Sequence, residues 1–427
     1  MNKISTRERI RNHPLIRTLF ELEGNQKVLT FLEPLWGIPQ NLIAPYATLY
    51  MYELGVNDVQ IGLLMSIAMF VQMISAFAGG IIADRAGRKV TCNFGDFLGW
   101  CIPCVIWAVS QNFWFFLAAI VLNSFEQVNQ TAWNCLLIED APSGQILHIY
   151  TWVTISGLLS VFFAPISGFV ISRVSLVPVM RVLYFIFAVC MTVKCLITIR
   201  CTKETRQGMK RKEQTKGQSL WYMISEYRYI LPRIFQDKPT VKILIIMVLL
   251  QMTTQITNNF FSLYTTENLG IQKSFLALFP ILRAVIMLIF MFVMQEKLEN
   301  FPFRIPMGVG FLLYIGSQLI LIFSPHRNYI FIILYTIMEA FAFALVVPRK
   351  DSMLALYVDP EERARIVSVL GVIMFIFASP SGYIAGKLSS INRQLPFILN
   401  MSLYVISGII TIRFNDPLPE YLETEND

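Results

Sequence analysis

Residues 80–89 read Gly80-Ile81-Ile82-Ala83-Asp84-Arg85-Ala86-Gly87-Arg88-Lys89, a charged turn between two apolar runs. The two runs, near residues 59–82 and 93–110, approach or exceed the roughly 20 residues that a helix needs to cross a bilayer. A charge beside hydrocarbon costs several kcal/mol unless it is paired or reaches water. We therefore expect residues 80–89, called the charged turn below, to form a hinge at the membrane surface whose charges have partners.

The composition indicates that the whole chain, like the segments beside the charged turn, belongs to a membrane protein. Of 427 residues, 55% are hydrophobic and only 15% are charged, which is more apolar surface than a soluble core of this length can bury. Most linkers between the apolar runs are short, and the runs lack the alternation of barrel strands, so soluble folds and β-barrels are excluded. We expect an all-α membrane protein whose twelve spans lie near 30–54, 59–82, 93–110, 113–137, 147–171, 177–199, 241–265, 273–294, 304–324, 328–348, 366–387 and 394–412.

Basic residues set the expected orientation. The first 27 residues contain six Lys or Arg and no apolar run of signal-peptide type, so we expect this tail to stay in the cytoplasm. The charged turn and the linker at 201–240 are also basic, whereas the loops on the opposite side carry about one Lys or Arg each. An even number of spans places both termini in the cytoplasm, for a multi-pass protein of the plasma membrane, or of the inner membrane in a bacterium. The net charge of +7 follows from this bias and does not indicate nucleic-acid binding.

The chain repeats at half its length. Gly55 and Gly270 follow similar Leu-Tyr stretches 215 residues apart, and Pro165 and Pro380 have the same offset. Two pseudo-symmetric six-helix bundles are implied, with a substrate site at their interface near the bilayer midplane. The expected units are a tail at 1–27, a first bundle at 28–200, a linker at 201–240, a second bundle at 241–413 and a tail at 414–427.

The charged turn resembles the signature loop between helices 2 and 3 of the major facilitator superfamily, G-x-L-A-D-R-x-G-R-K, with Ile82 in place of Leu. The resemblance implies the twelve-span fold of that superfamily and a gate latch. In this latch Asp84 meets the N-terminal end of helix 11, while Arg88 pairs with an acid at the end of helix 4. A carboxylate is stabilised at a helix N-terminus, and Arg forms bidentate carboxylate pairs. The expected gating residues are Gly80, Asp84, Arg85, Gly87, Arg88, Lys89 and either of Glu139 and Asp140, with Asp96 as a further nearby acid; Arg85 and Lys89 alternatively serve only orientation.

Three ionisable residues fall near the middle of expected spans: Glu126, Arg283 and Glu339. Each costs at least about 2.5 kcal/mol at a bilayer centre unless it faces a partner or a wet cavity. Glu126 and Glu339 are 213 residues apart, close to the repeat offset, so we expect roughly pseudo-symmetric positions. At least one of these carboxylates is expected to bind and release a proton; alternatively, Arg283 neutralises Glu339 as a structural pair.

Polar side chains at helical spacing mark the faces that cannot contact lipid. One such stripe runs along the seventh span, and shorter ones lie on the first and fourth spans. The family resemblance implies that helices 1, 4, 7 and 10 line the central cavity. The alternative is hydrogen bonding between helices. The expected substrate-binding residues are Trp36, Gln40, Asn41, Asn129, Gln130, Trp133, Gln251, Gln255, Asn258 and Arg283.

Catalysis is not indicated. The chain has three histidines, no P-loop, no metal-ligand cluster and no nucleophile beside a base, so we expect no enzyme, no cofactor and no metal site. Because no ATP-binding P-loop is found, transport should be secondary, which means driven by an ion or solute gradient. The intramembrane carboxylates, and a stretch from Gly157 to Gly168 that resembles the Gly-Pro motif of proton-driven exporters, favour proton-coupled export of amphipathic small molecules by a monomer. The alternatives are an uptake symporter or facilitator for a polar solute such as a sugar or nucleoside, and a receptor that has kept the fold.

Overall fold

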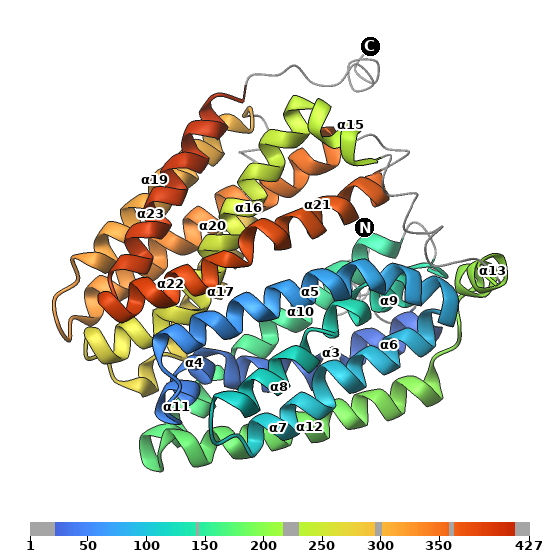
Figure 1. The fold of residues 1–427 in the computed structure, drawn as a ribbon, viewed down its shortest axis with the longest axis horizontal. Helices are drawn as coiled ribbons and strands as arrows, with labels where there is room; N and C mark the ends of the chain where they lie inside the picture. Colours follow the sequence, from blue (N-terminus) through green and yellow to red (C-terminus); the bar gives the residue numbers. More distant parts are fainter. Residues whose placement is uncertain (1–21, 142–144, 217–229, 295–300, 358–362, 415–427) are drawn as a thin grey trace, which may run out of the picture.

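The computed structural model describes residues 22–141, 145–216, 230–294, 301–357 and 363–414. Helices dominate this part of the chain (Figure 1). Ten of them are long and apolar enough to cross a membrane, and each coincides with a span expected from the sequence. The other two expected spans, 30–54 and 113–137, are helical but interrupted, at Ala44–Tyr46 and at residues 124–125. The protein is thus an all-helical, multi-pass membrane protein.

The N-terminal half is built from residues 24–201, and the short helix α13 follows it. Its second span, α5, begins with a capping box in which Asn57 accepts from the Gln60 backbone and the Gln60 side chain accepts from Asn57. The elements are α3 (Gly24–Ile43), η1 (Ala44–Tyr46), α4 (Ala47–Glu53), α5 (Asp58–Ala86), α6 (Arg88–Asp96), η2 (Phe97–Cys101), α7 (Ile102–Ala108), α8 (Phe113–Asn123), α9 (Glu126–Ile138), α10 (Ile146–Val161), α11 (Ala164–Arg173), α12 (Leu176–Cys201) and α13 (Arg206–Gln214).

The C-terminal half lies beside it, drawn from yellow-green to red in Figure 1. Its elements are α15 (Ile230–Gln236), α16 (Lys238–Leu263), η5 (Tyr264–Asn268), η6 (Lys273–Phe275), α17 (Leu278–Val293), α19 (Arg304–Ile322), α20 (Tyr329–Tyr357), α21 (Arg363–Ala378), α22 (Pro380–Ile391) and α23 (Leu395–Ile412).

The internal repeat is visible in the helix breaks. The prolines that lie 215 residues apart occupy the first turns of α11 and α22, directly after a break in the helix. Proline lacks an N–H and cannot continue the hydrogen-bond ladder of the preceding helix, so it is tolerated best in a first turn. The same local rule therefore divides span 5 and span 11 at equivalent places.

The two halves contact each other around the start of α5, which we call the Asp58 end. Asp58 accepts hydrogen bonds from the Ser389 hydroxyl (2.6 Å) and from Arg393 Nε (3.3 Å). Glu53 forms an ion pair with Lys273 across the same interface. Glycines permit the close approach of α5 and α22, since a Cβ added to Gly386 would lie 2.6 Å from the Asp58 carbonyl oxygen.

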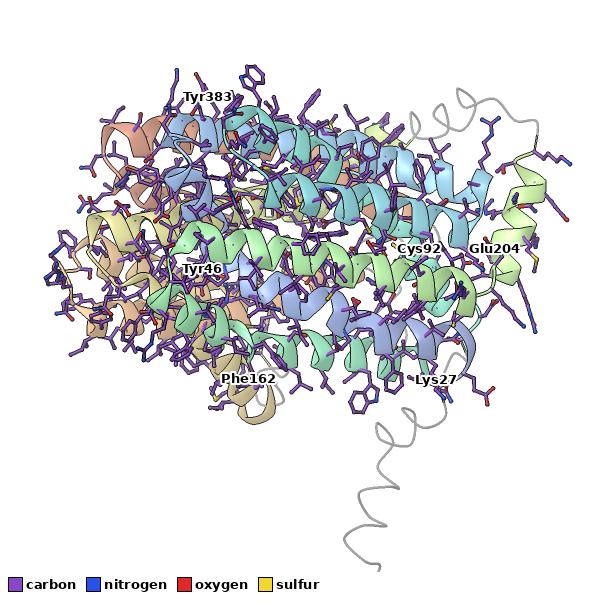
Figure 2. The ribbon with its side chains drawn as sticks, turned by 90° about the horizontal axis from the view of Figure 1, so that it is seen from below. Lys27, Tyr46, Cys92, Phe162, Glu204 and Tyr383 are labelled. Atoms are coloured by element: carbon purple, nitrogen blue, oxygen red, sulfur yellow. The ribbon has the colours of Figure 1, made fainter. Side chains whose placement is uncertain are left out.

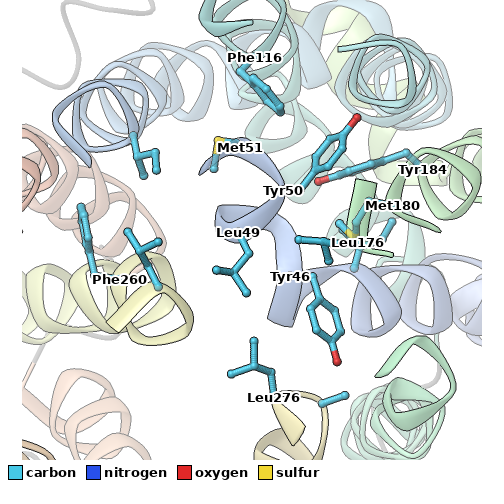
Figure 3. Close-up of a cluster of buried hydrophobic side chains, with 14 of the residues drawn as sticks. Tyr46, Leu49, Tyr50, Met51, Phe116, Leu176, Met180, Tyr184, Phe260 and Leu276 are labelled. Carbon is cyan, nitrogen blue, oxygen red and sulfur yellow. The ribbon is translucent and has the colours of Figure 1, made fainter. Parts of the chain in front are cut away.

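A large apolar cluster reinforces this contact. Tyr46, Leu49 and Tyr50 of the first span are fully buried, and they lie with Phe260 and Leu276 of the other half in one continuous cluster (Figure 3). The Tyr50 hydroxyl donates to the Trp107 carbonyl (2.8 Å), which satisfies its only polar group. The opposite end of the bundle carries Lys27, Cys92 and Glu204 (Figure 2).

Candidate functional site

A cavity of about 530 Å³, called the central cavity, lies between the two halves. Helices α3, α4 and α10 of the N-terminal half and α16, α17 and α20 of the C-terminal half form its wall. Amide and hydroxyl groups alternate there with aromatic and aliphatic side chains. The residues that define it include Gln40, Asn41, Thr48, Leu158, Thr257, Asn258, Asn259, Phe261, Ser262, Phe279, Arg283, Met287, Tyr335, Thr336 and Glu339. Its volume and mixed lining suit a small organic molecule.

An ion pair lies in the wall of this cavity. Arg283 Nη2 is 3.2 Å from Glu339 Oε1, and the two side chains are 31% and 12% exposed. The Arg283 guanidinium also lies 4.4 Å from the ring centroid of Phe343, so one face is covered by an aromatic side chain. The ion pair between Arg283 and Glu339, which the sequence analysis gave as the alternative to a proton-binding Glu339, is therefore present. Because the pair also borders the cavity, a charged group on a ligand can compete with either partner.

Aromatic side chains give the cavity a flat apolar wall. The rings of Phe261 and Tyr335 are stacked, with centroids 5.2 Å apart and planes inclined by 19°. Phe279 packs edge-on against Phe261 at 5.8 Å. These three residues were not selected from the sequence, because an aromatic residue in an apolar span is ordinarily lipid-facing or core.

The expected substrate residues divide between different places. Gln40, Asn41 and Asn258 border the central cavity together with Arg283. Gln251 and Gln255, about two turns and one turn before Asn258 on α16, are not among its lining residues in the described chain. The Gln255 side-chain oxygen Oε1 instead accepts from Asn259 Nδ2 at 3.2 Å. The polar stripe therefore reaches the cavity only at its last turns.

The remaining expected residues line a second cavity, of about 180 Å³, inside the N-terminal half. We call it the N-half cavity. Its wall is formed by Glu33, Trp36, Asp96, Trp100, Glu126, Asn129, Gln130, Trp133, Val153 and Lys194. Glu126 and Glu339 consequently border different cavities.

Lys194 is a further residue that was not selected from the sequence. Its Nζ lies 3.7 Å from Glu33 Oε2 and 3.8 Å from Asp96 Oδ2. Asp96 also accepts from Asn129 Nδ2 at 2.6 Å, so it belongs to this cluster and its ion-pair partner is Lys194 rather than Arg88. The signal was available, because Glu33 and Lys194 also interrupt apolar spans and the cost of an intramembrane charge applies to them equally.

The charged turn forms a compact network. Arg88 Nη1 lies 2.6 Å from Asp84 Oδ1, and Arg88 Nε lies 3.1 Å from Glu139 Oε1. Of the two acids that follow α9, Glu139 is thus the partner of Arg88, while Asp140 accepts from the backbone of Arg206. The start of span 11, where Asp84 was expected to bind, is the N-terminal end of α21 at Arg363. The side chains of its first residues lie outside the described part of the chain, so this contact stays a prediction.

Glu204 completes the network from the chain beyond α12. Its carboxylate accepts the backbone N–H groups of Arg88 (2.8 Å) and Lys89 (3.1 Å), which are free donors in the first turn of α6. Gly87, which joins α5 to α6, has φ 99°, a conformation that favours glycine, and Glu204 packs against it. Arg85 is exposed and Gly80 has open space around it, so neither belongs to the network core.

A polar cavity between two helical halves of a membrane-spanning bundle is the arrangement typical of secondary transporters. A family model described as the MFS_1 like family matches residues 41–392, and the chain belongs to that family. It is therefore a major facilitator transporter and not an enzyme.

Curated relatives and solved structures agree with this assignment. Multidrug resistance protein MdtG of Escherichia fergusonii is 26% identical over 204 residues, covering 46% of this chain and 48% of the relative. MdtG of Citrobacter koseri is 28% identical over 186 residues, covering 42% and 44%. The chain thus aligns with about half the length of these relatives. A mutant of the nucleoside transporter NupG has the same fold, with a TM-score of 0.73 at 16% identity over 92% of this chain and 100% of that one. A bacterial homologue of the lysosomal transporter Spinster gives 0.70 at 14% identity, covering 91% and 95%.

Proposed function

We propose that this protein exports amphipathic small molecules across the plasma membrane by alternating access, driven by protons. The observation that carries the proposal is the central cavity, where stacked aromatic rings, amides and the Arg283–Glu339 pair face one space. A compound with an apolar body and a charged or polar end would be bound on both its parts. The multidrug resistance relatives support the same substrate class.

The substrate would bind to Gln40, Asn41, Asn258 and Arg283 against the stacked rings of Phe261 and Tyr335. The network around Arg88 would hold the cytoplasmic ends of the N-terminal helices together while the halves rock. At least one of Glu126 and Glu339 would take up a proton in each cycle. In this scheme both termini are cytoplasmic and a monomer is sufficient.

A second candidate function is uptake of a polar solute such as a nucleoside or sugar. Amide and hydroxyl groups form much of the central cavity, and they suit hydroxyl-rich ligands that also stack on aromatic rings. The shared fold with the nucleoside transporter adds no substrate information at 16% identity. The direction of transport and the ligand distinguish this candidate from the first.

The test uses purified protein in proteoliposomes with an imposed pH gradient. We expect transport of ethidium, an amphipathic cation, to follow the gradient in the unmodified protein and to fall by about tenfold or more in Glu339→Gln, which corresponds to about 1.4 kcal/mol or more. The matched control is Glu267→Gln, an exposed carboxylate of the same half that is outside the cavity lining. Radiolabelled uridine is assayed in parallel.

Two results would overturn parts of the proposal. If Glu126→Gln and Glu339→Gln both leave the gradient-driven flux unchanged, the transporter is not proton-coupled through these carboxylates. If uridine accumulates and ethidium does not move, the polar-solute function replaces drug export.

A further inference from the structure

Two buried thiols meet where the third span, which is built from α6, η2 and α7, packs against the sixth span, α12. Cys101 ends η2, and its Sγ lies 3.9 Å from the Sγ of Cys195 on α12. Both are free cysteines, and the residues are only 4% and 5% exposed. Neither is among the described residues that line the two cavities, so the proposed transport function leaves this thiol pair unused.

The sequence around Cys101 suggests a different partner. Cys101-Ile102-Pro103-Cys104 has the C-x-x-C spacing that is typical of local redox pairs. The sulfur contact that the structure records is instead with Cys195, which is 94 residues later in the chain. Helix packing therefore selects a distant cysteine as the partner of the first cysteine in this motif.

The packing around η2 holds the two sulfur atoms side by side. The rings of Trp100 on η2 and Phe187 on α12 are in contact, with centroids 5.1 Å apart. On the other side of η2, Asn123 Nδ2 donates to the Gly99 carbonyl at 2.6 Å, and a Cβ added to Gly99 would lie 2.8 Å from the Glu126 backbone nitrogen. The segment is thus pressed between α12 and the helices α8 and α9.

We propose that Cys101 and Cys195 are an oxidative modification site, at which hydrogen peroxide converts the two thiols to a disulfide that ties the third span to the sixth. One sulfur attacks a peroxide oxygen, the O–O bond breaks, and a sulfenic acid and one water are formed. The second sulfur then attacks the sulfenic sulfur, which forms the S–S bond and releases a second water. Each cysteine loses one electron, the peroxide gains both, and the two thiol protons leave in the water.

The burial of the pair determines which oxidant fits. Hydrogen peroxide is small and uncharged, so it can enter a membrane-spanning bundle that excludes large, charged thiol reagents. The sulfurs must approach from 3.9 Å to about 2.05 Å, which side-chain rotation and a small adjustment of the π-helical segment η2 can supply. Because the second sulfur is already in contact, the second step is effectively intramolecular and fast. The inference is independent of the proposed function.

The bond should also stabilise the protein, because it closes a long loop in the unfolded chain. Cys101 and Cys195 are 94 residues apart, and longer loops lose more entropy when they are closed. We therefore expect the unfolding temperature of the oxidised protein to rise by about 2 °C or more.

The experiment treats purified full-length protein with hydrogen peroxide, blocks the remaining thiols with N-ethylmaleimide under denaturing conditions, and locates disulfides by peptide mass spectrometry. We expect the Cys101–Cys195 peptide to be the main linked product and to be absent in Cys195→Ser, together with the rise in unfolding temperature. Cys190→Ser, at a half-buried cysteine on the same helix, is the matched control that should keep both. Cys104→Ala should also keep the link, and Cys101→Ala replaces Cys195→Ser if that variant does not fold.

Several results would overturn the proposal. These are a Cys101–Cys104 link in place of the expected one, no disulfide at Cys101, or a linked protein whose unfolding temperature is unchanged. Protein oxidised after unfolding should give a mixture of disulfides, so the same mixture from folded protein would show that the fold does not select this pair. Because the assay needs no substrate and no pH gradient, its failure is separate from failure of the ethidium flux test.

Discussion

The contact between the halves at the Asp58 end makes a quantitative prediction. The Asp58 side chain is 8% exposed and accepts from two groups of the other half, the Ser389 hydroxyl at 2.6 Å and Arg393 Nε at 3.3 Å. Asp58→Asn keeps the shape and one acceptor oxygen but removes the charge. We expect the closed Asp58 end to be destabilised relative to the state in which this end is open.

The size of this free-energy change follows from the two hydrogen bonds whose acceptor changes from a carboxylate to a neutral amide. A hydrogen bond to a charged group contributes about 1.5–3 kcal/mol. Arg393 is 22% exposed and recovers part of its loss from water, so a net change of about 2 kcal/mol is expected, or about 30-fold in the ratio of closed to open molecules. The control is Glu53→Gln at the same interface. Its pair with Lys273 is 29% and 34% exposed, and such a surface pair contributes at most about 1 kcal/mol, or about fivefold.

Spin-label distances measure this ratio. Cysteines replace Gln111 and Asn392, one exposed position in each half, in a protein whose seven native cysteines are changed to serine. The long-distance population should grow in Asp58→Asn far more than in Glu53→Gln, and Arg393→Gln should resemble Asp58→Asn. Equal responses of Asp58→Asn and Glu53→Gln would refute the assignment of the closed state to the buried contact.

Two further predictions use matched pairs of positions. Gly386→Ala should oppose closure at the Asp58 end, because its Cβ would lie 2.6 Å from a backbone oxygen of α5. Gly371→Ala is the control, since its Cβ would enter open space and the spin-label distances should not change. Equal effects of the two substitutions would contradict the packing argument. Glu204→Gln should lower stability by about 1 kcal/mol, since α6 loses a charged acceptor at its first turn, and thermal unfolding should detect this. Glu213→Gln, an exposed residue of α13, is the control that should stay within about 0.5 kcal/mol, and a loss as large as that of Glu204→Gln would remove the capping explanation.

Local sequence rules predicted the membrane spans because each depends on a continuous apolar run. The ten long apolar helices fall where hydropathy placed them, and the breaks in span 5 and span 11 fall at the repeated prolines. The charged turn was also predicted from the sequence, since Gly87 and the charged residues around it are neighbours in the chain. The partner of Arg88 was narrowed to two adjacent acids, and the fold selected Glu139.

Local sequence rules did not predict how the polar and charged side chains divide between the two cavities. Glu126 and Glu339 miss the repeat offset by two residues, and two residues rotate a helical side chain by about 200°. That rotation is consistent with one carboxylate lining the N-half cavity and the other the central cavity. An offset counted along the chain does not give the position of a side chain around its helix, and that position decides which cavity the side chain borders.

Length, hydropathy and local spacing are sufficient to predict a multi-pass helical membrane protein with an internal repeat and a charged turn between its second and third spans. Only the tertiary structure brought Lys194 to Glu33 and Asp96, placed Glu204 at the start of α6, and stacked Phe261 on Tyr335. These contacts join helices that are far apart in the chain. Their partners are fixed by how each helix is rotated and packed, and no short-range pattern encodes that rotation.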